Sequence, residues 1–174
     1  MVKRTAYEAC GSHRRLALEV LDDIKLGKII KQGGFRSGVA VAPDAVTVRW
    51  HAGLGNLIRG VEKNFFAAAQ FKLSIAIVQL VTLLLFNVAP TLGVIFGHGW
   101  LRLFAALALL VPLGFLMGVD LVMRVSPLYA FTLPLAALVF TYMLARSTLI
   151  TLKQGGIYWR GTFYPLADLR RSNV

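Results

Sequence analysis

Residues that build disulfides and metal sites are scarce in this sequence. Cys10 is the only cysteine among 174 residues, which excludes a disulfide within the chain. The three histidines, His13, His51 and His98, do not have the spacing of zinc ligands, and there is no CxxC pair. The N-terminal segment lacks the apolar core of a secretory signal peptide. The sequence therefore predicts neither a disulfide-stabilised secreted domain nor a zinc site.

Acidic residues are also few, since 8 Asp and Glu stand against 19 Lys and Arg, for a formal net charge of +11. Such a balance suits nucleic acid, anionic lipid headgroups or substrates that carry a diphosphate. Nucleic-acid-binding modules interleave aromatic residues with basic ones, and this sequence does not. We therefore expect no nucleic-acid partner and take lipid and phosphate-bearing molecules as the partners to consider.

Apolar residues are abundant and dominate the chain after Lys72. Hydrophobic residues make up 57% of the sequence and the mean hydropathy is +0.67, above the usual range of a soluble domain. Three uncharged runs of 29, 17 and 21 residues follow Lys72, and a membrane-spanning helix needs about 20. A soluble domain of this size could not bury so many apolar residues. We expect transmembrane helices at about 73–97, 101–120 and 126–148.

The polar first part of the chain has the pattern of a small mixed α/β structure. Apolar residues at helical spacing predict a helix that begins at Asp22 and is ended by Gly33 and Gly34. The segment "GVAVAPDAVTVRW" alternates in polarity on the far side of a turn at Pro43, which predicts a two-stranded hairpin ending at Trp50. The predicted fold class is thus an α-helical membrane protein with a small α/β part.

A second helix is expected directly before the membrane region. Its apolar residues share one face and its basic residues flank that face, as in helices that lie in the bilayer interface. The tail combines arginines with tyrosine and tryptophan, which favour headgroup depth. The chain divides into a polar segment (1–52), an interfacial helix (53–72), a membrane region (73–152) and a basic aromatic tail (153–174).

Two pairs of residues are candidates for chemistry, and each has two interpretations. Asp22 and Asp23 stand at a helix N-terminus, where carboxylates are favoured by the helix dipole and by capping without any chemistry. One of them could instead be a general base that takes a proton from an acceptor hydroxyl. Arg49 and Trp50 could be a packed tryptophan beside a solvated charge, or could hold a diphosphate near the membrane surface.

Four segments, taken in order, resemble the C-terminal portion of a membrane-bound family-2 glycosyltransferase. They are "VKRTAYEACGSH", "VLDDIKLGKIIKQGGFR", "VTVRWHAGLGNLIRGVEKNFFAA" and "GGIYWRGTFYPLADLR". The likeness is to the branch that contains ceramide glucosyltransferase and the hopanoid- and carotenoid-associated glycosyltransferases. It covers nearly the whole chain and implies that residues 1–52 are the end of a GT-A-type nucleotide-sugar transferase domain.

The resemblance implies roles for five residues. Asp23 corresponds to the general base and Asp22 to its neighbour in the acidic pair. Arg49 and Trp50 match the end of the family's RW motif, and His13 ends its glycine–histidine segment, so all three are implied to bind substrate. The implied reaction transfers a hexose from a nucleotide sugar, with inversion, to a membrane lipid acceptor.

Two departures from the family pattern limit these expectations. Val46 stands where the RW motif would carry Gln or Arg, which disfavours a processive polysaccharide synthase. The family's donor-binding half, with its DxD motif for Mg or Mn and the sugar diphosphate, has no counterpart in these residues. We expect that this chain binds no metal or cofactor by itself, is inactive alone and depends on an upstream catalytic half. The alternative is a non-catalytic membrane anchor or assembly subunit.

The expected location is the inner membrane of a bacterium. Twelve of the 19 basic residues precede the first apolar run, which places residues 1–72 on the cytoplasmic side. Three complete crossings would put the tail on the opposite side, although Lys153, Arg160, Arg170 and Arg171 favour the cytoplasm. The two rules conflict, and we expect three crossings because the uncharged runs are clear.

Overall fold

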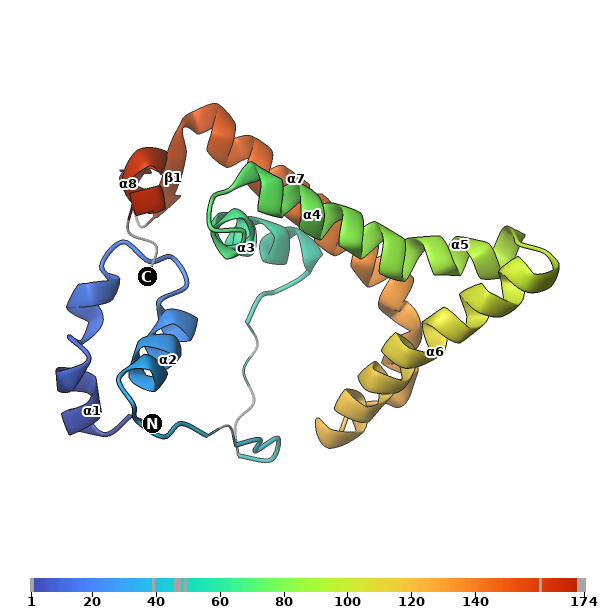
Figure 1. Ribbon diagram of the computed structural model, residues 1–174, viewed down its shortest axis with the longest axis horizontal. Coiled ribbons are helices and arrows are strands. Elements are labelled where there is room, and N and C mark those ends of the chain that lie inside the picture. The colour runs from blue at the N-terminus through green and yellow to red at the C-terminus, as the bar shows by residue number, and fades with distance from the viewer. Residues whose placement is uncertain (1, 39, 46–47, 49, 160, 172–174) are drawn as a thin grey trace.

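The computed structural model describes the whole chain except residues 1, 39, 46–47, 49, 160 and 172–174, and the described part is mostly helical (Figure 1). Most helices precede one small antiparallel sheet, and a short helix follows it. The elements are α1 (Arg4–Ala9), η1 (His13–Leu16), α2 (Asp22–Gln32), α3 (Leu54–Ala68), α4 (Leu73–Leu83), η2 (Leu84–Val88), α5 (Ala89–Phe96), α6 (Gly99–Val122), η3 (Pro127–Thr132), α7 (Leu133–Gln154), β1 (Gly156–Trp159), β2 (Thr162–Pro165) and α8 (Leu166–Arg171).

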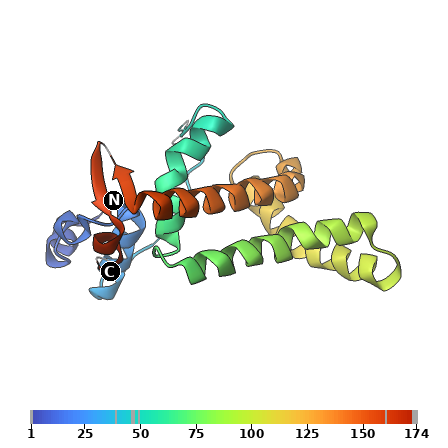
Figure 2. The ribbon, with the colours of Figure 1, turned by 90° about the horizontal axis from the view of Figure 1, so that it is seen from above.

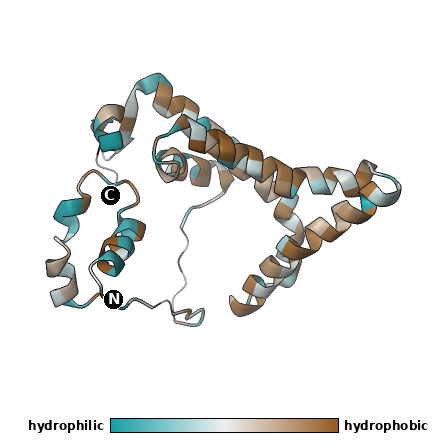
Figure 3. Ribbon diagram, viewed as in Figure 1, coloured by the Kyte–Doolittle hydropathy of each residue, from teal (hydrophilic) through white to brown (hydrophobic). Residues whose placement is uncertain are grey.

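Three helices are long and apolar enough to cross a membrane, which confirms the number and places expected from the sequence. They cover Leu73–Phe96, Gly99–Val122 and Pro127–Gln154. Their large apolar side chains are largely exposed, as expected where lipid rather than protein covers them. Figure 3 shows these apolar helices together at one end of the molecule and the hydrophilic segments mainly at the other.

The first apolar helix is continuous but contains one π-helical turn. Pro90 is in the first turn of α5, where its ring and missing N–H interrupt the regular hydrogen bonds of the preceding turn. Side chains bind carbonyls nearby, since Asn87 Nδ2 donates to the Leu83 carbonyl at 3.1 Å and Thr91 Oγ1 donates to the Asn87 carbonyl at 2.8 Å. Such bonds allow a proline to persist inside a membrane helix.

The polar N-terminal segment forms a small unit around α2. The predicted helix is confirmed, with Gly33 as its C-cap. Its buried face, Ile29 and Ile30, packs with Cys10 and Leu16 from the preceding segment. The apolar face of α2 that the helical spacing predicted is therefore the face that packs in this small core.

The hairpin predicted up to Trp50 is wrong for the residues that the structure describes between 35 and 52, because none of them is in a strand. A turn does form, with Ala45 N–H donating to the Ala42 carbonyl at 3.1 Å. A two-stranded hairpin is marginal without a further strand or a packed face, and the described sheet contains only β1 and β2. The small sheet lies in the tail instead.

A hydrophobic core joins the polar elements to the start and end of the apolar helices. It contains side chains from before α2, from α3 and the turn after it, from α4, from α7, from β1 and from α8. The buried members are Val20, Phe66, Ala69, Phe71, Ala76, Leu144, Ile157 and Leu169. Arg170 Nε also donates to the Phe71 carbonyl at 3.1 Å. The tail is thus packed where the chain enters the first apolar helix.

This packing bears on the expectation that three crossings place the tail on the far side. Three complete crossings would separate Lys72 from Gln154 by the thickness of the hydrocarbon, about 30 Å, yet the segments next to them share one core. In Figures 1 and 2, α7 runs back alongside α4 toward the polar elements. The tail and the segment before α4 therefore lie together at one end of the first and third apolar helices.

The third apolar helix accounts for this arrangement. Tyr129 and Leu133, at its beginning, line a cavity with Leu83 and Asn87 from the middle of the first apolar helix. The third helix therefore starts beside the middle of the first one. Counting apolar runs cannot detect this, because length and composition show only that a helix could cross.

Candidate functional site

The two candidate carboxylates begin α2, as the sequence indicated. Asp22 is half-buried and Asp23 is exposed. The Asp23 N–H donates to Asp22 Oδ1 at 3.1 Å, and the Ile24 N–H donates to Asp23 Oδ1 at 2.7 Å. Each carboxylate thus accepts from the backbone of the next residue and satisfies a donor that a helix N-terminus leaves without an intrahelical partner.

The other predicted site residues lie on different elements from the acidic pair. His13 begins η1, where its Nδ1 is 2.7 Å from the Tyr7 hydroxyl. Trp50 is 69% exposed and its ring lies against that of His51, at 5.1 Å between centroids. Arg49 lies outside the described residues. Within the described part, no hydrogen bond, ion pair or ring contact joins Asp23 to Trp50 or to His13.

The described residues do not fit a divalent metal. Among them, no three His, Cys, Asp or Glu side chains come close enough to hold an ion. Asp22 and Asp23 are adjacent in sequence, and the backbone N–H groups that they bind occupy one oxygen of each. We therefore assign no metal to the described residues and derive no step through one.

The contact between α3 and α7 is a polar feature that the sequence did not predict. Arg146 Nη2 lies 2.9 Å from Glu62 Oε2, so α7 and α3 share an ion pair beside the apolar core. Ser147, fully buried, accepts from the Phe66 N–H at 3.0 Å and donates to the Glu62 carbonyl. Those two backbone groups are four residues apart, so the hydroxyl joins the hydrogen bonding of one turn of α3. The sequence feature that could have predicted this contact is Arg146, which lies in an otherwise uncharged run. A charged residue within an apolar helix usually has a partner.

Two substitutions at Ser147 should distinguish the stability contributed by its hydrogen bonds from the stability contributed by the close packing of α7 against α3. Ser147→Ala is expected to lower the free energy of unfolding by only about 1 kcal/mol, because the two α3 backbone groups can pair within their helix. Ser147→Leu should cost about 1–3 kcal/mol or more, because its larger side chain has no space against α3. Unfolding of the purified protein in mixed detergent measures both, with Leu149→Ala, at an exposed position on the same helix, as control. Equal effects of the two Ser147 variants would contradict this account.

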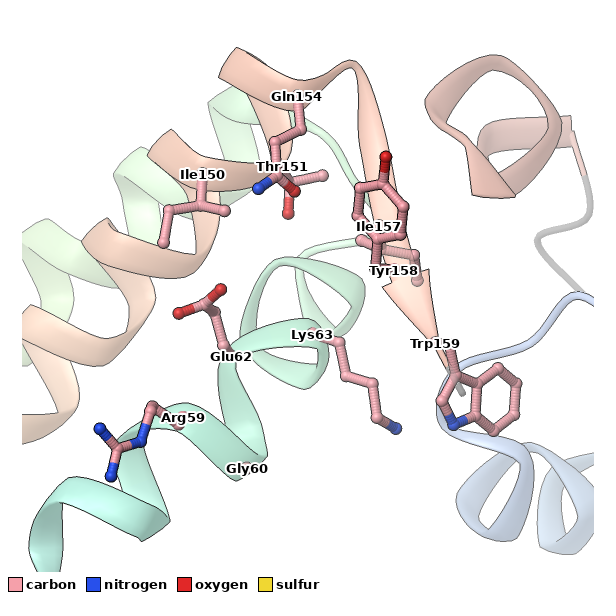
Figure 4. A pocket seen from close by; sticks show the side chains of 10 residues that line it. All are labelled: Arg59, Gly60, Glu62, Lys63, Ile150, Thr151, Gln154, Ile157, Tyr158 and Trp159. Carbon is pink, nitrogen blue, oxygen red and sulfur yellow. The ribbon is translucent and has the colours of Figure 1, made fainter. Parts of the chain in front are cut away.

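A cavity of about 330 Å³ opens between α3, the end of α7 and β1 (Figure 4). Its polar wall includes Arg59, Lys63 and Thr151, and its aromatic wall is formed by Tyr158 and Trp159. Lys63 Nζ lies 4.8 Å from the centre of the Trp159 ring, a cation–π contact. The elements that form this cavity come from the interfacial helix, from the end of the third apolar helix and from the tail, and the first of these is far from the other two in sequence.

No family model, no curated protein and no solved structure matches this chain. The class of protein follows from the structure, since three helices are long and apolar enough to cross a membrane and their apolar side chains are exposed. The chain is an integral membrane protein with its polar elements gathered at one end of the apolar helices.

Proposed function

We propose that the chain is the C-terminal, acceptor-side portion of an inverting family-2 glycosyltransferase that transfers a hexose from a nucleotide sugar to a membrane lipid. The observation that carries this proposal is the place of Val20, which precedes Asp22 by two residues. Val20 is buried in the core shared by α3, the start of α4 and the tail. The acidic start of α2 is therefore close in sequence to a residue that shares a core with the start of the first apolar helix, and in this proposal the lipid hydroxyl reaches Asp23 there.

Each part of the proposed enzyme has a stated role. Asp23 takes the proton from the acceptor hydroxyl, Asp22 maintains the local charge and orientation, and Arg49, Trp50 and His13 contact the substrates. A positioned base of this kind contributes about 10²–10⁴-fold to a rate. In this proposal an upstream catalytic half holds the sugar diphosphate and a Mg or Mn ion, as the family resemblance implies. The cytoplasmic side of a bacterial inner membrane is the proposed location, because both the first 72 residues and the tail are basic.

A transfer assay with two proteins tests this proposal. The chain alone should incorporate no labelled hexose into extracted lipid and should show no metal-dependent affinity for a UDP-sugar. Fused behind the donor-binding half of a family-2 enzyme, it should form labelled glycolipid. A folded fusion that binds the UDP-sugar but labels no lipid would contradict the proposal, as would chelator-sensitive UDP-sugar binding by the chain alone.

A non-catalytic anchor or assembly subunit is the second candidate. The observation in its favour is that Asp22 and Asp23 each accept a hydrogen bond from the next backbone N–H, a stabilising role that needs no chemistry. The two candidates differ in the consequence of removing the Asp23 charge.

A further inference from the structure

We propose that the cavity between α3, the end of α7 and β1 binds the phosphate-bearing headgroup of an anionic phospholipid from the surrounding bilayer. This proposal does not depend on sugar transfer. It follows from the charge of the cavity, from its place at the end of an apolar helix and from the apolar surface beside it.

The charge of the cavity favours an anion. Arg59 and Lys63, one turn apart on α3, both line it. Among the described residues that line it, Glu62 is the only one with a carboxylate, and Arg146 pairs with this carboxylate at 2.9 Å. The Arg59 guanidinium donates to Asn56 Oδ1 at 2.9 Å and extends away from Lys63 in Figure 4. The other three groups, Lys63, Glu62 and Arg146, carry one net positive charge. A phosphate group matches that charge, and basic residues at a membrane surface attract anionic headgroups.

The uncharged part of the lining suits the rest of a headgroup. Gln154 and Thr151 at the end of α7 offer an amide and a hydroxyl for hydroxylated groups, and Tyr158 adds a phenol. In Figure 4 the Thr151 side chain projects into the space between α7 and α3, and Lys63 extends toward Trp159. Tyrosine and tryptophan are enriched where the headgroups of a bilayer lie.

The position of the cavity supplies a place for acyl chains. It opens at the last turns of the third apolar helix, where Leu149 is 68% exposed and Ile150 lines the cavity itself. A lipid whose phosphate lies beside Lys63 can therefore run its chains down the apolar surface of α7. A soluble phosphate compound has no acyl chains that could pack against that surface.

Quenching of Trp159 fluorescence tests the proposal in the full chain. Trp50→Phe and Trp100→Phe, both at exposed positions, leave Trp159 as the only tryptophan. The protein is placed in nanodiscs of phosphatidylcholine with increasing amounts of a phosphatidylglycerol whose acyl chains carry bromine close to the glycerol. Quenching should saturate at a low fraction of brominated phosphatidylglycerol, whereas brominated phosphatidylcholine should quench only in proportion to its amount.

Variants and a soluble competitor separate the outcomes. Lys63→Gln should weaken the preference for phosphatidylglycerol roughly fivefold, while Lys31→Gln, which removes the same charge from exposed α2, should not. Equal quenching by the two lipids, or an equal effect of Lys31→Gln, would overturn the proposal. Displacement by glycerol 3-phosphate at similar concentrations would assign the cavity to a soluble phosphate compound and overturn the lipid assignment.

Discussion

Replacing Asp23 by Asn in a complete enzyme that carries this segment is expected to lower the turnover of sugar transfer by about 10²–10⁴-fold, the usual contribution of a positioned base. Asparagine has nearly the same shape and keeps an oxygen that can accept the Ile24 N–H now bound at 2.7 Å. The helix should therefore form as before, and binding of the lipid acceptor should survive. Turnover and acceptor affinity are measured separately on the purified enzyme.

Asp168→Asn is the matched control, because Asp168 is an exposed carboxylate in the first turn of α8, a different helix. It should leave turnover unchanged. Near-normal turnover of the Asp23→Asn enzyme would assign Asp22 and Asp23 to capping alone and favour the anchor function.

Phe66→Ala should have the largest effect on stability. Phe66 is fully buried and its ring meets that of Phe71 edge-on, at 5.7 Å between centroids. It lies in the core that holds the tail against α3, and emptying such a site costs about 3–5 kcal/mol. Unfolding in mixed detergent measures the loss. Phe96→Ala, at a 70% exposed position at the end of α5, should cost far less. Similar losses for both variants would show that this core does not hold the tail.

Local patterns predicted the helices well because helical spacing is contained in the sequence itself. α2 begins at Asp22 and has Gly33 as its C-cap, and the apolar face of α3 buries Val61. The exposed side chains of the apolar helices likewise follow from composition. These features depend on residues within a few turns of one another.

The two strands illustrate where local patterns fail. The segment before Trp50 alternates in polarity, yet its described residues find no neighbouring strand to pair with. The pair that does form joins Tyr158 to Phe163 across a turn with Gly161 at φ +81°. Aromatic residues around a glycine were a usable signal for this hairpin, and the tail in which they lie was interpreted only as a headgroup anchor.

The candidate site depends on contacts between distant segments. The hydroxyl of Ser147 lies 81 residues from the Phe66 N–H that it binds, and no local pattern reports such a pair. The position of the tail was missed for a related reason. Counting uncharged runs reports no contact between distant segments, whereas Leu169 of the tail shares a core with Phe71, just before the first apolar helix.

The side of the membrane on which each segment lies is the central claim, and labelling single cysteines in the full chain tests it most directly. In a Cys10→Ser background, which removes the only cysteine, one cysteine is introduced in place of Lys28, His98 or Asp168, all exposed. A membrane-impermeant maleimide is applied to intact cells and to inverted vesicles. We predict that positions 28 and 168 react only in inverted vesicles and position 98 only in intact cells. Labelling of positions 28 and 168 from opposite sides would contradict the account.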